Sequence, residues 1–166
     1  KNAGLDLLKK LERYDGSVPR GAQPWEVPLH TPDILASAYL AKAYVIGYEL
    51  TGDRQFLDRA VYWAWTGVPF VYLASPTQPV GDYATIPVFG ATYWTGSWFG
   101  LPVQWCGLVY ADVLYRLDRY DKNVIWKRLA DGIAISGVQQ TCPIGEDDRR
   151  QGLLPDSFQL RTAIRN

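Results

Sequence analysis

Hydrophobic residues gather in two long runs, Ile34–Leu50 and Gln104–Leu117, and each run is apolar nearly all the way round. A helix without a polar face has to be enclosed by its neighbours, so both runs predict buried inner helices. Each is followed by a run with one polar and one apolar face, Arg54–Trp65 and Asn123–Ser136, which is typical of an outer helix. The pattern therefore predicts inner and outer helices in pairs.

The connections between these runs alternate between two lengths. Within each pair the chain turns tightly, around Thr51–Asp53 and Tyr120–Lys122. Gly52 suits a helix C-terminus, and Asp53 and Asp121 suit the N-caps of the outer helices. Antiparallel hairpins of this kind place the short turns at one end and the long loops at the other, where we expect the functional site. The long connections, rich in Pro, Gly and Trp, are Asp15–Asp33, Gly67–Val103 and Val138–Asp156.

Weaker signals complete the predicted fold. Leu5–Tyr14 has the leucine stripe of a short amphipathic helix, and Asp156 suits the N-cap of a third inner helix, Ser157–Ile164. Between residues 68 and 92, Phe70–Leu73 and Thr85–Phe89 predict short strands or a small β-hairpin. The expected fold class is all-α, with antiparallel αα-hairpins and long irregular loops at one end.

Composition limits the kind of partner. The chain of 166 residues is one domain's worth, 1–166, and its 17 basic residues balance its 17 acidic ones. This balance argues against a nucleic-acid partner, and no uninterrupted apolar run is long enough for a membrane span. One histidine cannot build a His-based zinc site, and Cys106 and Cys142 lack metal-binding spacing, so we expect no metal and no cofactor. Cys106 is expected to be a buried thiol, and a Cys106–Cys142 disulfide stays an alternative.

The turn and the loops carry a resemblance to a group of enzymes. Thr51-Gly52-Asp53 followed by Phe56-Leu57-Asp58-Arg59-Ala60, with Trp-rich loops before inner helices, resembles the six-hairpin α/α-toroid carbohydrate-active enzymes. These include many glycoside hydrolases and some polysaccharide lyases. The resemblance implies a carbohydrate substrate and, with it, an extracellular or periplasmic location.

The length of the chain departs from that family pattern. A complete toroid has six hairpins, whereas residues 1–166 hold about two and a half. The chain starts at Lys1 and contains no Met, which favours a fragment of a larger toroid. We therefore expect the rest of its own chain, or a neighbouring domain, as a partner that completes the barrel.

Candidate catalytic residues lie in the long loops. Glycosidases need two carboxyl groups, for which Glu26, Asp82 and Asp156 are the candidates. Toroidal lyases use His or Tyr as the base against a uronate, and His30 and Tyr83 suit that part. Each residue has a structural alternative, namely a turn, a cap or a solvated side chain.

Candidate binding residues follow from the aromatic content of 14%. A pyranose ring has an apolar C–H face, and an indole offers a flat apolar wall with one hydrogen-bond donor. The expected sugar contacts, including one amide at a helix start, are Trp25, Trp94, Trp98 and Gln104.

Two other functions remain open at this point. A non-catalytic helical domain that binds glycan, or that supports a neighbouring catalytic domain, predicts the same aromatic residues. A terpenoid-cyclase type of toroid needs an Asp-rich motif, and only Glu146–Asp148 approaches one, in a loop. We therefore rank the cyclase last.

Overall fold

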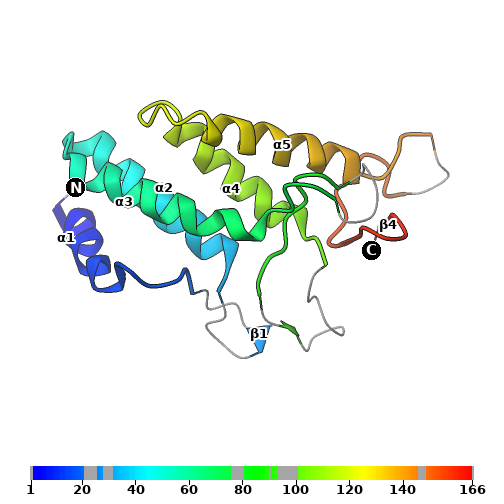
Figure 1. The fold of residues 1–166 in the computed structure, drawn as a ribbon, viewed down its shortest axis with the longest axis horizontal. Coiled ribbons are helices and arrows are strands. Elements are labelled where there is room, and N and C mark those ends of the chain that lie inside the picture. Colours follow the sequence, from blue (N-terminus) through cyan, green and yellow to red (C-terminus); the bar gives the residue numbers. More distant parts are fainter. Residues whose placement is uncertain are drawn as a thin grey trace.

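Helices dominate the part of the chain that the computed structural model describes, which is residues 2–20, 26–27, 32–75, 81–89, 91–92, 101–145 and 149–165 (Figure 1). This part holds five α-helices: α1 (Asn2–Leu11), α2 (Ile34–Thr51), α3 (Arg54–Gly67), α4 (Gln104–Leu117) and α5 (Ile125–Gln140). Short 3-10 turns follow α1 at Glu12–Tyr14 and α3 at Val68–Phe70. The predicted, mainly helical chain is confirmed. None of the described helices is both long and apolar enough to cross a bilayer.

The first tight turn forms as its residues predict. Asp33 starts α2 by accepting hydrogen bonds from the backbone N–H groups of Leu35 and Ala36. Gly52 ends α2 in the left-handed region, with φ of 72° and its N–H donating to the carbonyl of Tyr48. Asp53 then caps α3 by accepting from the N–H of Gln55. Helices α2 and α3 are therefore an antiparallel hairpin.

The second tight turn differs from the prediction in its cap. Helix α5 begins at Ile125, whose N–H donates to the side chain of Asn123. The carboxylate of Asp121 accepts instead from the indole N–H of Trp126, at 2.6 Å. The prediction of Asp121 as the cap is wrong, because the buried indole N–H of Trp126 needs an acceptor and takes this one.

Both inner helices start at the same end of the molecule. The N–H of Ile34 donates to the carbonyl of Pro87, and the N–H of Val103 donates to the carbonyl of Thr85. One short stretch, Thr85–Phe89, therefore contacts the starts of α2 and α4. Figure 1 shows the two tight turns toward the upper left and the long connections toward the bottom and right.

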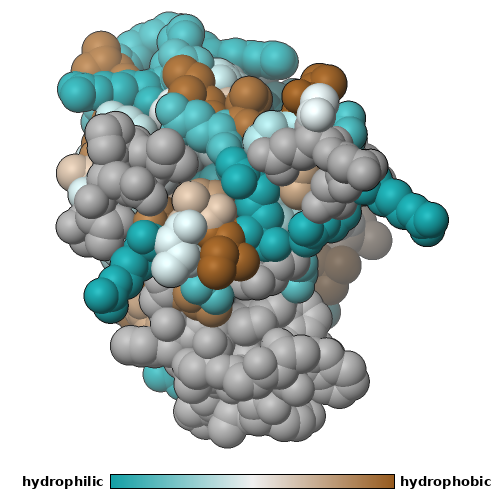
Figure 2. All heavy atoms as spheres, turned by 90° about the vertical axis from the view of Figure 1, so that its right-hand side faces the viewer, coloured by the Kyte–Doolittle hydropathy of each residue, from teal (hydrophilic) through white to brown (hydrophobic). Residues whose placement is uncertain are grey.

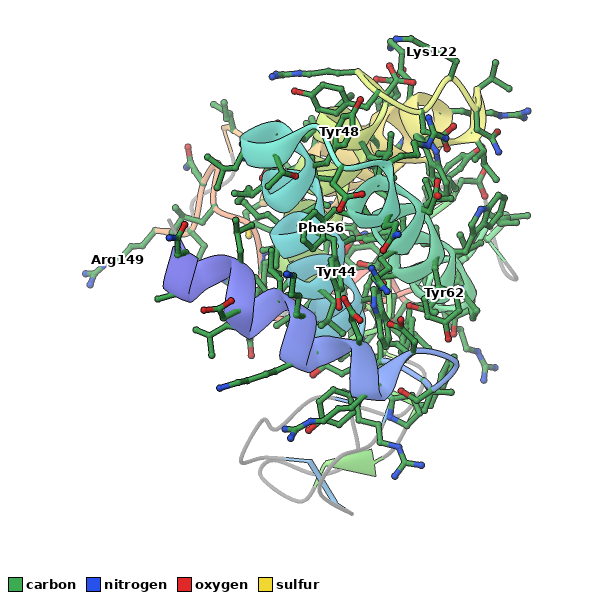
Figure 3. The ribbon with its side chains drawn as sticks, turned by 90° about the vertical axis from the view of Figure 1, so that its left-hand side faces the viewer. Tyr44, Tyr48, Phe56, Tyr62, Lys122 and Arg149 are labelled. Atoms are coloured by element: carbon green, nitrogen blue, oxygen red, sulfur yellow. The ribbon has the colours of Figure 1, made fainter. Side chains whose placement is uncertain are left out.

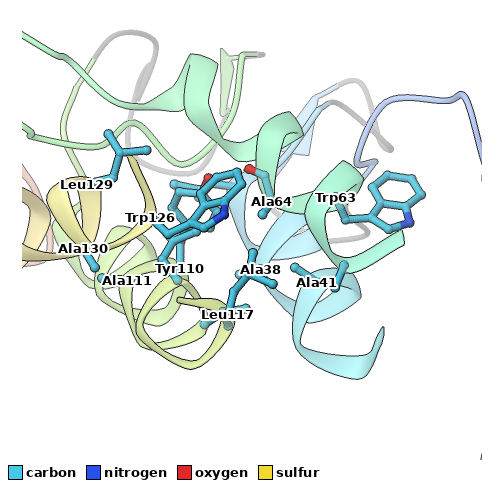
Figure 4. Close-up of a cluster of buried hydrophobic side chains, with 14 of the residues drawn as sticks. Ala38, Ala41, Trp63, Ala64, Tyr110, Ala111, Leu117, Trp126, Leu129 and Ala130 are labelled. Carbon is cyan, nitrogen blue, oxygen red and sulfur yellow. The ribbon is translucent and has the colours of Figure 1, made fainter. Parts of the chain in front are cut away.

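The core lies between the two hairpins (Figure 4). Tyr110 of α4 donates its hydroxyl hydrogen to the carbonyl of Ala64 on α3, and burial raises its pKa. The Tyr110 ring lies where a Cβ on Gly67 would be, at 2.5 Å, so only glycine fits there. Trp126 of α5 meets Trp65 of α3 edge to face, with ring centroids 4.9 Å apart. Aromatic side chains thus connect the outer helices α3 and α5 to each other and the inner helix α4 to α3.

The stretch between residues 68 and 92 contains the expected pairing. Val71 and Thr85 form an antiparallel bridge, and backbone hydrogen bonds run from Tyr72 to Ala84 and from Ile86 to Phe70. Farther along, β2 (Ala91–Thr92) pairs with β1 (Glu26–Val27) in an antiparallel register. The predicted antiparallel pairing is therefore present as a single bridge with flanking hydrogen bonds, and neither Phe70–Leu73 nor Thr85–Phe89 forms a strand.

The prediction of a third inner helix is wrong. Ser157–Ile164 contains strand β3 (Phe158–Gln159), which pairs antiparallel with β4 (Ile164–Arg165). The N–H of Phe158 donates to the carbonyl of Pro102, and Ala163 turns the chain with φ of 56°. So short a segment does not nucleate a helix by itself, and backbone pairing satisfies its polar groups instead. Figure 2 views this end and shows hydrophobic side chains separated by hydrophilic ones.

The two cysteines are separate buried thiols. Cys106 in α4 is inaccessible to solvent, and Cys142 is 4% exposed. The buried thiol expected for Cys106 is confirmed, and the alternative disulfide does not form.

One ion pair joins the inner helices near the tight turns. Arg116 on α4 donates from Nε to Oε1 of Glu49 on α2 at 2.8 Å and from Nη2 to Oε2, and Tyr120 also donates to Oε1. The hydrogen bonds from Arg116 are the main reason that the pKa of Glu49 is lowered from its ordinary 4.5. A depressed carboxyl pKa stabilises the fold above the ordinary pKa, and this stabilisation is lost as pH falls through the lowered value.

Replacing Glu49 with glutamine should therefore cost about 0.5–1 kcal/mol of unfolding free energy at pH 7, since the pair is only partly buried. The difference from wild type should shrink below pH 4.5 and vanish below the lowered pKa. Urea unfolding across this pH range measures it. Asp112→Asn is the control, because Asp112 pairs with Lys42 while its side chain is 68% exposed. A wild-type-to-Glu49→Gln difference that did not change with pH would contradict this account.

Candidate functional site

Several predicted site residues lie outside the described residues, and for these the sequence prediction stands as it was. They are Trp25, His30, Trp94 and Trp98, together with the acidic run Glu146–Asp148. Glu26 is described through its backbone, which pairs with Thr92 between β1 and β2. This sheet joins two long connections that are far apart in the sequence.

Gln104 is part of a buried hydrogen-bond network at the start of α4. Its side chain is 1% exposed. The Oε1 atom accepts from the N–H of Thr85 and from Nε2 of Gln140, both at 2.9 Å, while Nε2 donates to the carbonyls of Ile133 and Tyr83. These bonds use the whole amide group, so it has nothing left to offer a substrate hydroxyl. Gln104 instead holds the stretch that begins at Thr85 against α4 and α5.

Asp82 and Tyr83 come shortly before this stretch in the sequence. Gly81 and Tyr83 both have positive φ, of 106° and 59°. Asp82 is exposed, and its Oδ1 accepts from the N–H of Ser75, which closes the loop. The Tyr83 ring packs where a Cβ on Gly132 of α5 would be, at 2.4 Å. Both residues therefore have a structural role; Asp82 is exposed, whereas Tyr83 is half-buried.

Asp156 belongs to the segment that approaches the start of α4 from the C-terminal side. Its side chain is exposed, whereas Pro155 and Phe158 beside it are buried. The backbone bond from Phe158 to Pro102 fixes this segment near Gln104. The prediction that Asp156 caps a helix is therefore wrong, because no helix begins there.

A pocket that the sequence did not predict lies between the N-terminal segment and helices α2 and α3. Its volume is about 780 Å³. The lining residues within the described chain are Leu11, Tyr14, Ser17, Val18, Arg20, Ala36, Tyr39, Leu40, Ala43 and Trp63. The only hint in the sequence is Tyr39, a large ring in the apolar run of α2 that is 58% exposed.

A second, smaller hollow of about 380 Å³ lies beside α3 and is polar, with Asp15, Asp58 and Arg59 in its wall. Arg59 donates from Nε to Asp15 at 3.0 Å and pairs with Glu12. The positive charge of Arg59 is therefore already balanced by these two carboxylates. Among the described residues, no group of three or more His, Cys, Asp or Glu side chains is arranged to hold a metal ion.

Comparison of this chain with protein-family models, with curated proteins and with solved structures gives no match. The function of this chain is therefore inferred from its own residues and their geometry.

Proposed function

We propose that this chain is part of a carbohydrate-active enzyme of the α/α-toroid kind, either a hydrolase or a lyase. The proposed site lies at the end where the long loops meet. The substrate would be a polysaccharide or oligosaccharide held by the loop tryptophans. Further hairpins, from the same chain or from a neighbouring domain, would complete the barrel.

One observation carries the proposal: Thr85–Phe89 is hydrogen-bonded to the starts of both α2 and α4. Two parallel helix starts direct their partial positive charge toward the same region, which favours anionic and hydroxyl-rich ligands, while the first N–H groups of α2 are already bonded to Asp33 and Pro87. The same stretch leads into β2, whose Thr92 faces Glu26. Glu26 therefore belongs to a loop system that is anchored to the core.

The contacts of the candidate residues make some of them better suited to catalysis than others. Glu26 and Asp156 suit the acid and base of a hydrolase, and the exposed carboxylate of Asp82 is a third candidate. His30 suits the base of a lyase. Tyr83 is weaker in that role because its ring packs against Gly132, and Gln104 is not used because its amide is fully bonded.

Glycan binding is tested most simply through the loop tryptophans. Isothermal titration of the 166-residue chain with neutral and uronate oligosaccharides should give saturable binding to at least one class. Trp25→Ala and Trp98→Ala should each weaken it about three- to tenfold, the value of about 0.5–1.5 kcal/mol for an aromatic contact. Trp65→Ala is the control, because this partly exposed tryptophan lies on α3. An equal loss of affinity in all three variants, or no binding of any oligosaccharide, would contradict the proposal.

A non-catalytic glycan-binding or supporting domain is the second candidate. The observation that favours it is that Tyr83 and Gln104 are engaged in packing and hydrogen bonds of the fold. Glycan binding without turnover, unaffected by Glu26→Gln, would select this function over the enzyme.

A further inference from the structure

The pocket beside α2 is lined mainly by aromatic and aliphatic side chains. Tyr14, Tyr39 and Trp63 give it aromatic walls, and Leu11, Val18 and Leu40 give it aliphatic ones. Its volume of about 780 Å³ falls in the range of small-molecule sites. The described helices of the chain therefore hold an apolar pocket of ligand size.

Few polar groups line this pocket, and most are already bonded. Ser17 donates its hydroxyl hydrogen to the carbonyl of Tyr14, and the hydroxyl of Tyr14 accepts from Arg13. A sugar buried there would lose water from many hydroxyls without finding partners for them, which is costly. The occupant should therefore have an apolar body.

The rim of the pocket carries one cation, Arg20, which is exposed. No ion pair within the described part of the chain uses Arg20: Arg59 holds Asp15 and Glu12 nearby, and Asp33 caps α2. None of the described lining residues is acidic. Since a guanidinium binds carboxylates with two parallel hydrogen bonds, the charge of the rim fits an anionic head group.

The dimensions of the pocket favour a small molecule over a helix of another protein. On α2 the lining runs from Ala36 to Ala43, which is about 10 Å of helix at 1.5 Å per residue. That is about two turns, short for a docked helix with several anchors. The N-terminal segment closes one side, and Trp63 of α3 closes another. Three elements thus surround the space.

Trp63, which forms part of this wall, also carries an unsatisfied hydrogen-bond donor. The residue is 1% exposed, and its indole N–H has no hydrogen-bond partner among the described residues. Figure 4 shows its ring projecting from α3 away from the cluster around Tyr110 and Trp126. A buried donor without an acceptor costs about 1–3 kcal/mol, and a ligand oxygen that reached it would remove that cost.

The N-terminal segment that forms the outer wall packs on α2 through α1 and is tied to α3 through Arg59 and Tyr62. Figure 3 shows α1 lying across α2, with Tyr44 and Phe56 behind it. Leu8 packs against Gly47, and the hydroxyl of Tyr44 donates to the carbonyl of Leu8; burial raises the pKa of Tyr44 to about 12. No side chain of α1 is fully buried. The wall is therefore part of the fold, fixed by contacts to both α2 and α3.

We propose that this pocket binds a small amphipathic carboxylate, with an acyl or aryl body between the N-terminal segment and α2 and its carboxylate on Arg20. This site is independent of the proposed glycan activity. A failure of one proposal therefore leaves the other standing.

Titration calorimetry of the 166-residue chain at pH 7.5 with octanoate, and with 1-octanol as its uncharged counterpart, tests the proposal. Octanoate should bind saturably at one site, and 1-octanol about tenfold more weakly. Arg20→Gln should weaken octanoate about tenfold, equal to about 1.4 kcal/mol, and leave 1-octanol unchanged. Arg128→Gln on α5 is the matched control, because Arg128 is also exposed and lies outside the pocket lining.

Filling the pocket is the second arm. Ala43→Leu should weaken both ligands at least about tenfold, whereas Ala134→Leu, a half-buried alanine on α5, should not. No saturable octanoate binding, or an unchanged affinity in Arg20→Gln, would overturn the proposal. So would a concentration-dependent dimer in sedimentation that Ala43→Leu dissociates, because the occupant would then be a second copy of the chain.

Discussion

Replacing Trp126 with alanine is expected to lower the free energy of unfolding by about 3–5 kcal/mol, the cost of removing a large aromatic side chain from a core. Trp126 is inaccessible to solvent, lies edge to face with Trp65 and donates to Asp121. Trp126 therefore packs the two hairpins against each other and also fixes the position of the second tight turn. Guanidinium unfolding at pH 7, followed by circular dichroism, measures the change.

Two matched variants separate the parts of this effect. Trp65→Ala removes the partner ring, which is 43% exposed, and should cost roughly 0.5–1.5 kcal/mol. Trp126→Phe keeps a ring in the core but loses the bond to Asp121, so its cost should lie between those of the two alanine variants. A Trp126→Ala variant within about 1 kcal/mol of wild type would mean that the hairpins do not pack through this residue.

Gly132→Ala should also destabilise the protein, by about 1–3 kcal/mol. A Cβ there would meet three atoms of the Tyr83 ring at 2.4–2.6 Å. The ring cannot easily withdraw, because the backbone of Tyr83 is bonded at both its N–H and its carbonyl, to Tyr72 and Gln104. Thermal unfolding compared with wild type measures the loss.

The control lies in the same helix. A Cβ on Gly137 would lie 3.2 Å from Cδ2 of Leu108, the end of a flexible side chain. Gly137→Ala should be neutral or stabilising, since alanine favours a helix over glycine by up to about 1 kcal/mol. In a double-mutant cycle, Tyr83→Ala should remove most of the cost of Gly132→Ala. Additive effects would contradict the proposed contact.

The hairpins were predictable because their signals are local. Gly52 and Asp53 act within one turn of their own position, through the bonds to Tyr48 and Gln55. An apolar run as long as Ile34–Leu50 has no stable exposed form as a helix, so its burial followed from its composition. The same local argument failed for Ser157–Ile164, where alternate burial of Phe158 and Leu160 fits a strand as well as a helix.

The site was less predictable because its contacts are distant in the sequence. Gln104 meets Thr85 and Gln140, which are 19 and 36 residues away. Nothing in the surroundings of Gln104 along the chain distinguishes a buried amide from one that faces a ligand. The pocket beside α2 forms because Tyr14–Arg20 lies against α2. The pattern of hydrophobic residues along the chain does not reveal that contact.

The function proposed for this chain is glycan turnover at the long-loop end, with Glu26 as one of the carboxyl groups that act on the substrate. The most direct measurement is product release from a panel of neutral and uronate polysaccharides by wild type and Glu26→Gln. Asp58→Asn is the control, since Asp58 is exposed near the tight turn. We predict turnover by wild type and by Asp58→Asn, with a loss of at least about hundredfold in Glu26→Gln. No product from any polysaccharide, or equal turnover in Glu26→Gln and wild type, would contradict the account.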